Sequence, residues 1–313
     1  MHPRSDRRHL LAFAGAVALG LMASAALAAS SRVRIVSFAT TPFPYDGLVP
    51  STGKPFLDVS DGMRRGHTSP RGGIYWEDET YSDKHVLLAI PPGFSPRRPA
   101  YLIVFLHGNN TLLQRDVATR QRVPQQLAES RLNAVLVAPQ LAADALDSSA
   151  GRFWEPGVFA RFLDEAAAHL AHLYGDRRTR PVFAAMPVVI VAYSGGYMPA
   201  SAALSVGGAD ARVAGVILLD ALYGETDKFA AWIARRKPQA FFFSAYSPSS
   251  AAENQNLQQM LENADVSFAT GIPKTLRRGR VRFLAVSDVP HEDFVTDAWT
   301  HDPLALLLRK LRP

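Results

Sequence analysis

The stretch from Pro187 to Tyr197 reads Pro-Val-Val-Ile-Val-Ala-Tyr-Ser-Gly-Gly-Tyr. Its first part, Val188 to Ala192, is a short apolar run rich in β-branched residues, which is typical of a central strand buried on both faces. The run stops abruptly at Tyr193-Ser194-Gly195-Gly196, and an alanine-rich segment follows. The pattern predicts a strand, a tight turn that carries Ser194, and then a helix.

A serine at such a turn is typical of a nucleophile elbow, in which a strained backbone pushes the hydroxyl out over the edge of the sheet. Ala192 stands where the first glycine of the G-x-S-x-G pattern usually is, and alanine is small enough to make this a mild departure. An ordinary Ser-Gly-Gly turn between a strand and a helix would have the same sequence. Both interpretations stay open on this stretch alone, because short motifs also occur by chance.

A second apolar strand is predicted from Tyr101 to Leu106, and His107-Gly108-Asn109-Asn110 follows it. Many serine hydrolases place a backbone N–H at such a strand end to bind an oxyanion, and take a second N–H from the residue after the nucleophile. The predicted oxyanion hole is therefore Gly108, Asn109 and Gly195. A plain Gly-Asn turn is the alternative, but the two motifs together are more specific than either alone.

Apolar strands alternate with helical patterns throughout residues 84–313. This alternation predicts an α/β fold, a mostly parallel central sheet with helices on both faces. One helical pattern, residues 117–130, contains Pro124, which is expected to interrupt it. Ligands of such sheets bind at the carboxyl ends of the strands. The polar residues that follow apolar strands, and are expected at this edge, are His107, Ser194, Asp220 and His291.

The clearest helix is predicted from Phe159 to Tyr174, where apolar residues recur at helical spacing and Gly175 can end the helix. His169 and His172 lie three residues apart in this helix, with Glu165 nearby. These are possible metal ligands, but no partner motif accompanies them. We expect no metal and no cofactor.

The N-terminal residues resemble a signal peptide. Three arginines precede an apolar run from Leu10 to Leu27, and Ala26-Leu27-Ala28 is a small-x-small cleavage pattern. The stretch from Asp6 to Leu11 also resembles a twin-arginine export signal. We expect cleavage after Ala28 and a periplasmic or secreted protein without a stable membrane anchor, an uncleaved anchor being the alternative.

The mature chain is expected to have two parts. Residues 29–83 are rich in Pro, Gly and Ser with interspersed aromatic residues, which predicts an irregular but ordered N-terminal extension packed on the core. Residues 84–313 form the α/β domain.

The 313-residue chain has no cysteine, which excludes disulfides and thiolate chemistry. Its formal charge falls from +6 to +4 without the leader, and no nucleic-acid motif accompanies this charge, so no nucleic-acid partner is expected.

Taken together, Leu106-His107-Gly108-Asn109, Ala192-Tyr193-Ser194-Gly195-Gly196, Asp220 at a strand end and a late His291 resemble the α/β-hydrolase superfamily. The resemblance covers roughly residues 84–311, and the order Ser, Asp, His along the chain matches the usual order of that superfamily. It implies acyl transfer through a serine ester, with Ser194 as nucleophile, His291 as base and Asp220 as acid.

Two of these roles have alternatives. His291 is preferred to His301 because it follows the last strand, in the loop where the base of the superfamily belongs, whereas His301 precedes the last helix. The acid most often follows the strand after that of Asp220, but that strand has no carboxylate before Glu253. Some lipase-like members carry the acid one strand earlier, as Asp220 would. Glu253 and Asp288 remain possible.

The resulting hypothesis is an exported serine hydrolase that cleaves a carboxylic ester, either a small molecule or one derived from the cell envelope. Residues expected around the substrate are His107, Trp154, Tyr193 and Tyr223. A peptidase or amidase acting on envelope peptides is the alternative within enzymes, and a non-catalytic binding protein on the same fold is the alternative outside them. The oligomeric state is left open.

Overall fold

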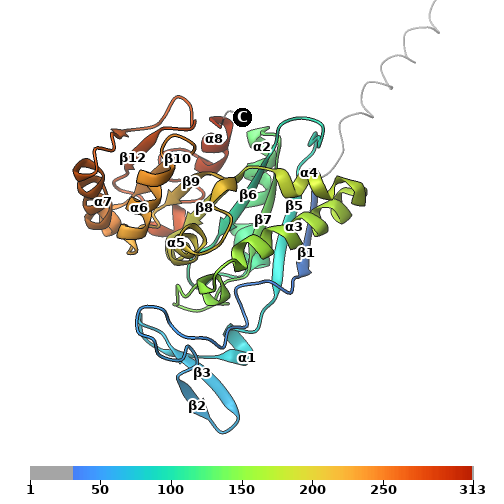
Figure 1. Ribbon diagram of the computed structural model, residues 1–313, viewed down its shortest axis with the longest axis vertical. Helices are drawn as coiled ribbons and strands as arrows, with labels where there is room; N and C mark the ends of the chain where they lie inside the picture. Colours follow the sequence, from blue (N-terminus) through green and yellow to red (C-terminus); the bar gives the residue numbers. More distant parts are fainter. Residues whose placement is uncertain (1–30, 312–313) are drawn as a thin grey trace, which may run out of the picture. The chain divides into compact units, whose positions relative to one another are not determined.

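The computed structural model describes residues 31–311, and the predicted signal peptide at 1–28 lies outside them. The strands (Figure 1) are β1 (Arg32–Ser37), β2 (Val59–Asp61), β3 (Arg64–Thr68), β4 (Ile74–Trp76), β5 (His85–Ile90), β6 (Tyr101–Leu106), β7 (Ala134–Pro139), β8 (Val188–Tyr193), β9 (Val213–Leu219), β10 (Phe241–Tyr246), β11 (Ala269–Thr270) and β12 (Val281–Ala285). The helices are α1 (Glu77–Thr80), α2 (Val123–Ser130), α3 (Val158–Tyr174), α4 (Arg180–Ala185), α5 (Tyr197–Ser205), α6 (Thr226–Arg236), α7 (Ala251–Asn263) and α8 (Pro303–Arg309).

The large sheet has the strand order β1-β5-β7-β6-β8-β9-β10-β12-β11. The pairs β1–β5 and β5–β7 are antiparallel, and the other pairs are parallel. The prediction of a mostly parallel α/β sheet is therefore confirmed. Because β6, β8, β9 and β10 run in the same direction, the loops after their carboxyl ends lie along one edge.

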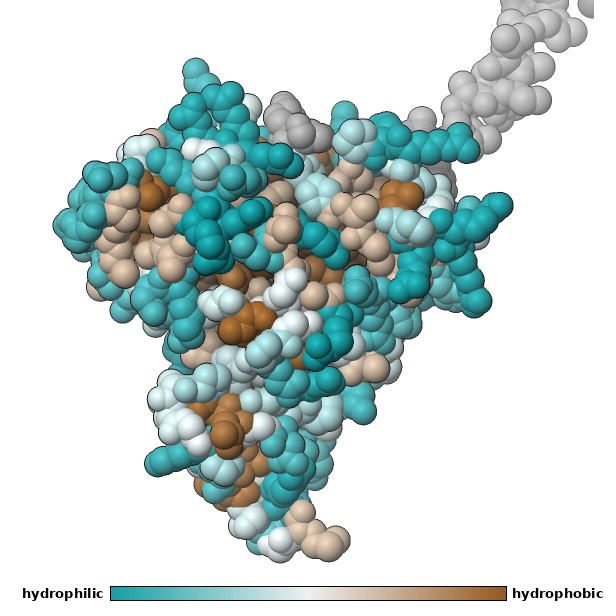
Figure 2. Space-filling model, viewed as in Figure 1, coloured by the Kyte–Doolittle hydropathy of each residue, from teal (hydrophilic) through white to brown (hydrophobic). Residues whose placement is uncertain are grey.

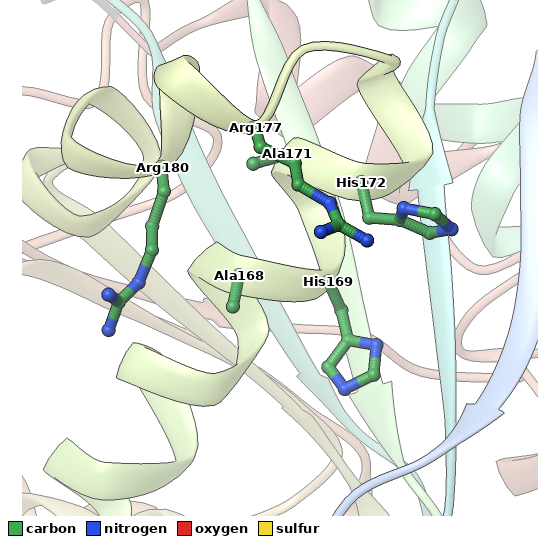
Figure 3. Close-up of a pocket in the computed structure, with 6 residues that line it drawn as sticks. All are labelled: Ala168, His169, Ala171, His172, Arg177 and Arg180. Carbon is green, nitrogen blue, oxygen red and sulfur yellow. The ribbon is translucent and has the colours of Figure 1, made fainter.

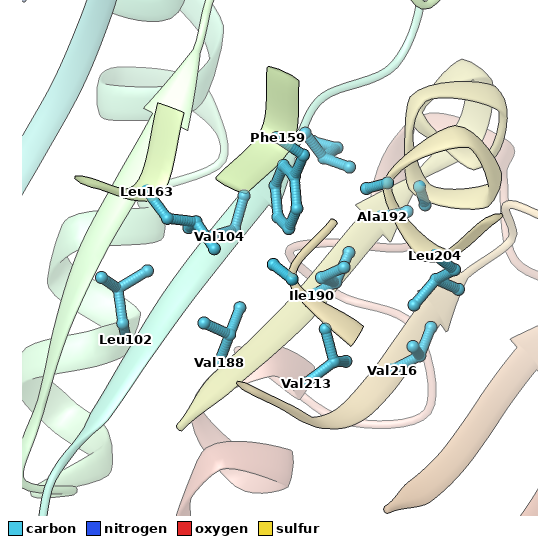
Figure 4. Packing of buried hydrophobic residues seen from close by; sticks show 14 of the residues in the cluster. Leu102, Val104, Phe159, Leu163, Val188, Ile190, Ala192, Leu204, Val213 and Val216 are labelled. Carbon is cyan, nitrogen blue, oxygen red and sulfur yellow. The ribbon is translucent and has the colours of Figure 1, made fainter. Parts of the chain in front are cut away.

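The central strands bury every residue, as their continuous apolar runs predicted: β6, β7, β8 and β9 have no exposed position. Their alternate side chains enter two separate cores. On one face Val104 and Ile190 pack near Phe159 of α3 and Leu204 of α5 (Figure 4). On the other face the strands pack against α2 and α8. Burying each such side chain stabilises the fold by roughly 1.5–3 kcal/mol.

The N-terminal extension is less separate than the sequence predicted. Its first residues, Arg32–Ser37, form β1 and pair along the whole of β5, so they belong to the large sheet. The boundary predicted at residue 84 is therefore wrong for this segment. Strands β2, β3 and β4 form a sheet of their own, drawn in blue below the large sheet in Figure 1. Large buried rings hold this part to the rest of the chain, among them Phe43, Phe56 and Tyr81.

Helix α3 confirms the predicted helix, since it runs from Val158 to Tyr174 and ends at Gly175, whose φ of 92° suits glycine. The predicted interruption of the helical pattern at Pro124 is confirmed. A π-helical segment, Leu113–Arg120, precedes α2, and Pro124 lies in the first turn of α2. Proline is tolerated there because an N–H at the start of a helix has no partner within the helix.

The face of the molecule shown in Figure 2 is mainly polar, with local apolar areas. Three large apolar side chains of the extension are exposed, namely Leu48, Met63 and Ile74. Within residues 31–311, no helix combines the length and the apolar character needed to cross a membrane.

Candidate active site

Three side chains form a hydrogen-bonded row at the carboxyl edge of the large sheet. Ser194 follows β8, Asp220 follows β9, and His291 lies in the loop after β12. The Oγ of Ser194 lies 2.7 Å from Nε2 of His291, and Nδ1 of the same ring lies 2.7 Å from Oδ2 of Asp220. The structure therefore brings together the serine, the histidine and the aspartate that the sequence singled out, from segments up to 97 residues apart.

Asp220 is fully buried and surrounded by donors. Its Oδ1 accepts hydrogen bonds from the Ser247 N–H and the Ser250 hydroxyl, and its Oδ2 accepts from the Ser247 hydroxyl and from Tyr223. Burial raises the pKa of Asp220, but hydrogen bonds from His291, Ser247 and Ser250 outweigh burial and lower the pKa to about 2. The carboxylate is thus ionised at neutral pH and orients Nδ1–H of His291.

The backbone at Ser194 is strained, with a φ of 52° in the left-handed region. A non-glycine residue held there costs roughly 1–3 kcal/mol. Close packing maintains this turn: a Cβ on Gly196 would lie 2.3 Å from the carbonyl oxygen of Leu106, and a Cβ on Gly108 would lie 2.7 Å from the Cβ of Ser194. Glycine at both positions lets β6 and the turn after β8 approach, which presents the Ser194 hydroxyl to His291.

His107 is not a substrate-binding residue, contrary to the sequence-based prediction. Its ring is fully buried, its Nδ1–H donates to the carbonyl of Gly108 (2.7 Å), and its Nε2 accepts from the Leu141 N–H (2.8 Å). Burial lowers the pKa of His107 to about 4, so the ring is neutral at pH 7. Because a trans peptide directs its C=O and N–H to opposite sides, this contact turns the Asn109 N–H away from His107.

A cavity of about 510 Å³ opens above the row and is lined by Ser194 and His291 together with Asn109. Of the predicted oxyanion residues, Asn109 lines this cavity, while Gly108 and Gly195 lie in closely packed turns next to Ser194 and Asn109. The next amide along the chain, that of Asn110, donates to the carbonyl of Ala145. The Asn109 side chain accepts from Ser148 at 3.2 Å.

Two of the predicted aromatic residues also line the cavity, and both contact His291. The Tyr193 ring stacks on the imidazole with centroids 5.2 Å apart, and its hydroxyl donates to the His291 carbonyl at 3.0 Å. The Tyr223 hydroxyl lies 3.1 Å from Asp220 and 3.4 Å from Nδ1 of His291. Burial raises the pKa of Tyr223 to about 12, so this hydroxyl remains a donor. Both tyrosines therefore position the histidine.

Trp154 does not line the cavity, so the prediction that it binds substrate was wrong. Its ring packs edge-on against Tyr45 and Phe56 of the extension, with centroids 5.7 and 6.2 Å away. The reason lies in the N-terminal extension, whose aromatic residues reach the loop before α3. Trp154 therefore helps to attach the extension.

The alternative base and acids lie elsewhere. His301 is 70% exposed at its side chain and faces Asp297 and Asp302. Glu253 accepts a hydrogen bond from Thr226 at the start of α6. Asp288 is exposed.

The histidine face of α3 contacts the segment after β1. Glu165 accepts hydrogen bonds from the Ala39 and Thr40 N–H groups, at 2.7 and 2.9 Å, and His169 stacks on Phe38. Figure 3 shows His169 and His172 beside a cavity of about 450 Å³, with no carboxylate among the labelled side chains. Across residues 31–311, no group of three or more metal-binding side chains was found.

Sequence reasoning missed several contributors to this site. Ser247 and Ser250 hold Asp220, and Arg71 of the extension lines the cavity. The serines follow β10, the strand next to β9, so their place after an apolar run was a usable signal. Arg71 follows no such strand, and nothing in its local sequence indicated its position.

No protein-family model matches the sequence, and a search of curated proteins also returned no match. Among solved structures, the chain is similar to a ferulic acid esterase (TM-score 0.49, 14% identity, 90% of this chain and 97% of that chain covered). It is also similar to the feruloyl esterase module from Clostridium thermocellum (0.46, 13%, 87% and 98%). A third similar structure is an S-formylglutathione hydrolase from Agrobacterium tumefaciens (0.44, 12%, 76% and 92%).

The fold can be assigned from this structure alone, by the order of its strands and by the place of the hydrogen-bonded row. A strained serine stands between a buried strand and a helix, and an aspartate and a histidine follow later strands of the same sheet, in that chain order. Helices cover both faces of a mostly parallel sheet that begins with antiparallel strands. The chain has the α/β-hydrolase fold.

Proposed function

We propose that this protein is a serine hydrolase that cleaves a carboxylic ester through an acyl-enzyme on Ser194. The observation that carries the proposal is the continuous row from Ser194 through His291 to Asp220, with both hydrogen bonds at 2.7 Å, below an open cavity. A serine hydroxyl needs a neighbouring base to become a nucleophile, and an oriented imidazole provides one.

In the first half of the reaction the Ser194 oxygen attacks the ester carbonyl while Nε2 of His291 takes the hydroxyl proton. Asp220 stabilises the imidazolium that forms. The oxyanion accepts hydrogen bonds from the N–H groups of Asn109 and Gly195, and Gly195 lies in the 3-10 turn that leads into α5. The bond to the alcohol then breaks, and the imidazolium returns its proton to the departing alkoxide.

In the second half a water molecule attacks the acyl-Ser194 carbonyl, and His291 takes one of its protons. The bond to Ser194 breaks, the serine oxygen regains a proton from His291, and the carboxylic acid leaves.

The cavity of about 510 Å³ suits a small ester or one end of a larger molecule. We further propose that the enzyme acts after export, on the strength of the basic and apolar pattern of its first 28 residues.

The test uses a fluorophosphonate probe, which reacts covalently with activated serines, together with short 4-nitrophenyl esters and aminoacyl amides. We expect the protein to be labelled and to hydrolyse the esters, and Ser194→Ala to lose both properties. The matched control is Ser249→Ala, a serine of the same cavity that does not contact Nε2 of His291. Labelling that persists in Ser194→Ala would overturn the proposal, and hydrolysis of amides alone would change the substrate class.

A further inference from the structure

Arg71 is a cation placed in the cavity by a segment outside the sheet. It lies in the turn between β3 and β4, yet it lines the same cavity as Ser194 and His291. Its guanidinium carbon lies 5.6 Å from the centroid of the Tyr223 ring. Tyr223 in turn contacts Asp220 and His291, so one aromatic ring separates Arg71 from the hydrogen-bonded row.

Hydrogen bonds fix this turn to the wall of the cavity. The Ser69 hydroxyl donates to the carbonyl of Leu146 (2.8 Å) and accepts from the Arg71 N–H (3.2 Å). The Leu146 N–H donates to the Tyr75 hydroxyl (3.1 Å). Leu146 itself lines the cavity. The backbone of Arg71 is therefore held at the rim from both sides of the turn.

The other arginines of the cavity are already paired. Arg115 forms ion pairs with Asp116 and Asp144, at 2.9 and 2.7 Å, and Arg120 pairs with Asp116 at 3.0 Å. Arg71 differs: among the described residues, 31–311, no carboxylate lies within 4 Å of its guanidinium. The remaining acid of the lining is Glu292, which is exposed and adjacent to His291 in the chain. The negative charge of Glu292 would repel a substrate carboxylate placed next to it.

We propose that Arg71 binds a carboxylate of the substrate, so that the enzyme prefers esters that also carry a free carboxylate. This inference rests on the proposed function for its catalytic half. A guanidinium has five N–H donors in a planar fork that matches a carboxylate. The cation–π contact with Tyr223 holds the guanidinium beside the hydrogen-bonded row.

The experiment compares two esters that differ in charge, monomethyl glutarate and dimethyl glutarate, by titrating the acid released at constant pH. We expect a higher kcat/KM for the monoanion. Arg71→Gln should lower kcat/KM for monomethyl glutarate by at least about tenfold, the effect of losing a charge-assisted hydrogen bond, and change that for dimethyl glutarate by less than about twofold. Arg71→Lys should recover part of the loss, because it keeps the charge without the fork.

The matched control is Arg64→Gln, an arginine of the same hairpin that pairs with Asp78 and Glu79 and does not line the cavity. It should leave both rates unchanged. If Arg71→Gln leaves the ratio of the two rates unchanged, the inference is overturned while the proposed function stands.

A binding measurement separates the two proposals if no ester is hydrolysed. Glutarate and its neutral diamide are titrated calorimetrically into the Ser194→Ala protein and into the same protein with Arg71→Gln. We expect glutarate to bind more tightly than the diamide, and Arg71→Gln to weaken glutarate binding by about tenfold. Such binding without any esterase activity would support the carboxylate site and contradict the proposed function. Equal binding of glutarate with and without Arg71 would overturn the inference.

Discussion

At the scale of single residues, the ionised state of Asp220 depends on hydrogen bonds and not on exposure to water. The side chain is fully buried, and donors surround both of its oxygens. Its Oδ2 accepts from Nδ1 of His291, so the opposite nitrogen, Nε2, carries no proton and can accept the hydroxyl proton of Ser194. The tautomer of one ring thus depends on the charge of one carboxylate.

Asp220→Asn tests this dependence. An amide can keep its oxygen toward the Ser247 N–H and then presents its NH₂ group to Nδ1 of His291, which favours the wrong tautomer. We expect kcat to fall by about four orders of magnitude with little loss of folded structure. Ester hydrolysis and circular dichroism of the variant provide the two measurements. Glu253→Gln is the control and should keep its activity, and a near-normal Asp220→Asn enzyme would contradict the assigned role.

Residues at the ends of buried strands could be predicted from the sequence, whereas residues brought in by loops could not. Ser194, Asp220 and His291 each follow an apolar run, and parallel pairing places such positions at one edge. His107 follows the same rule but points into the protein, because Gly108 and Leu141 occupy both of its ring nitrogens. Arg71 depends on contacts between Ser69 and Leu146, which are 77 residues apart.

At the scale of elements, the end of β6 is organised by a buried imidazole. His107 joins the β6 loop to the end of β7 through Gly108 and Leu141. The ring must be neutral to make both contacts, since Nε2 accepts a hydrogen bond. Charging it would break the contact with Leu141 and place an unpaired charge in the core.

The two contacts of the His107 ring make the stability of the fold depend on pH. The pKa of His107 lies below its ordinary value of 6.5, at about 4 in the folded protein, so the unfolded chain binds the proton more readily. This contribution to stability is complete above pH 6.5 and is lost as the pH falls toward 4. We expect nitrogen NMR of labelled histidine to show the neutral Nδ1–H form of His107 at pH 5.5 in the folded protein. A protonated ring at that pH would refute the assignment.

Strand and helix predictions succeeded where burial alone determines the pattern. The runs that became β6, β8 and β9 are apolar because helices cover both of their faces. The place of β1 in the large sheet was not predicted, because β1 is an edge strand in which arginine alternates with apolar residues. Arg32 donates to the last carbonyls of α3, those of Leu173 and Tyr174. Pro124 indicated a break in the helical pattern because proline is tolerated in the first turn of a helix but not in its interior.

At the scale of the whole chain described here, the extension and the α/β domain share a core. Phe56 is fully buried among Phe43, Tyr45, Tyr81 and Trp154, with ring centroids 4.9–6.2 Å apart. Tyr81 also donates to Asp147, in the loop that carries Leu146. The extension therefore supports the cavity wall as well as covering it.

Phe56→Ala should reduce the free energy of unfolding by about 3–5 kcal/mol, the usual cost of emptying a buried aromatic site. Urea unfolding followed by tryptophan fluorescence measures this loss, and Trp154 reports directly on the site. Met63→Ala in the same extension is the control, because Met63 is fully exposed and its removal should cost almost nothing. Equal losses in the two variants would mean that the shared core does not stabilise the extension.

The β3–β4 turn is attached at Leu146 and stands apart from the Ser194 row. The turn contributes the charge of Arg71 to the cavity, but it contributes no residue to the Ser194 row. Its hydrogen bonds to Leu146 are made by the hydroxyls of Ser69 and Tyr75, which flank the turn. Grafting a different sequence between these two anchors would exchange the recognition group while the reaction centre kept its geometry. Under the proposed role of Arg71, the hairpin is a module whose replacement retunes substrate preference.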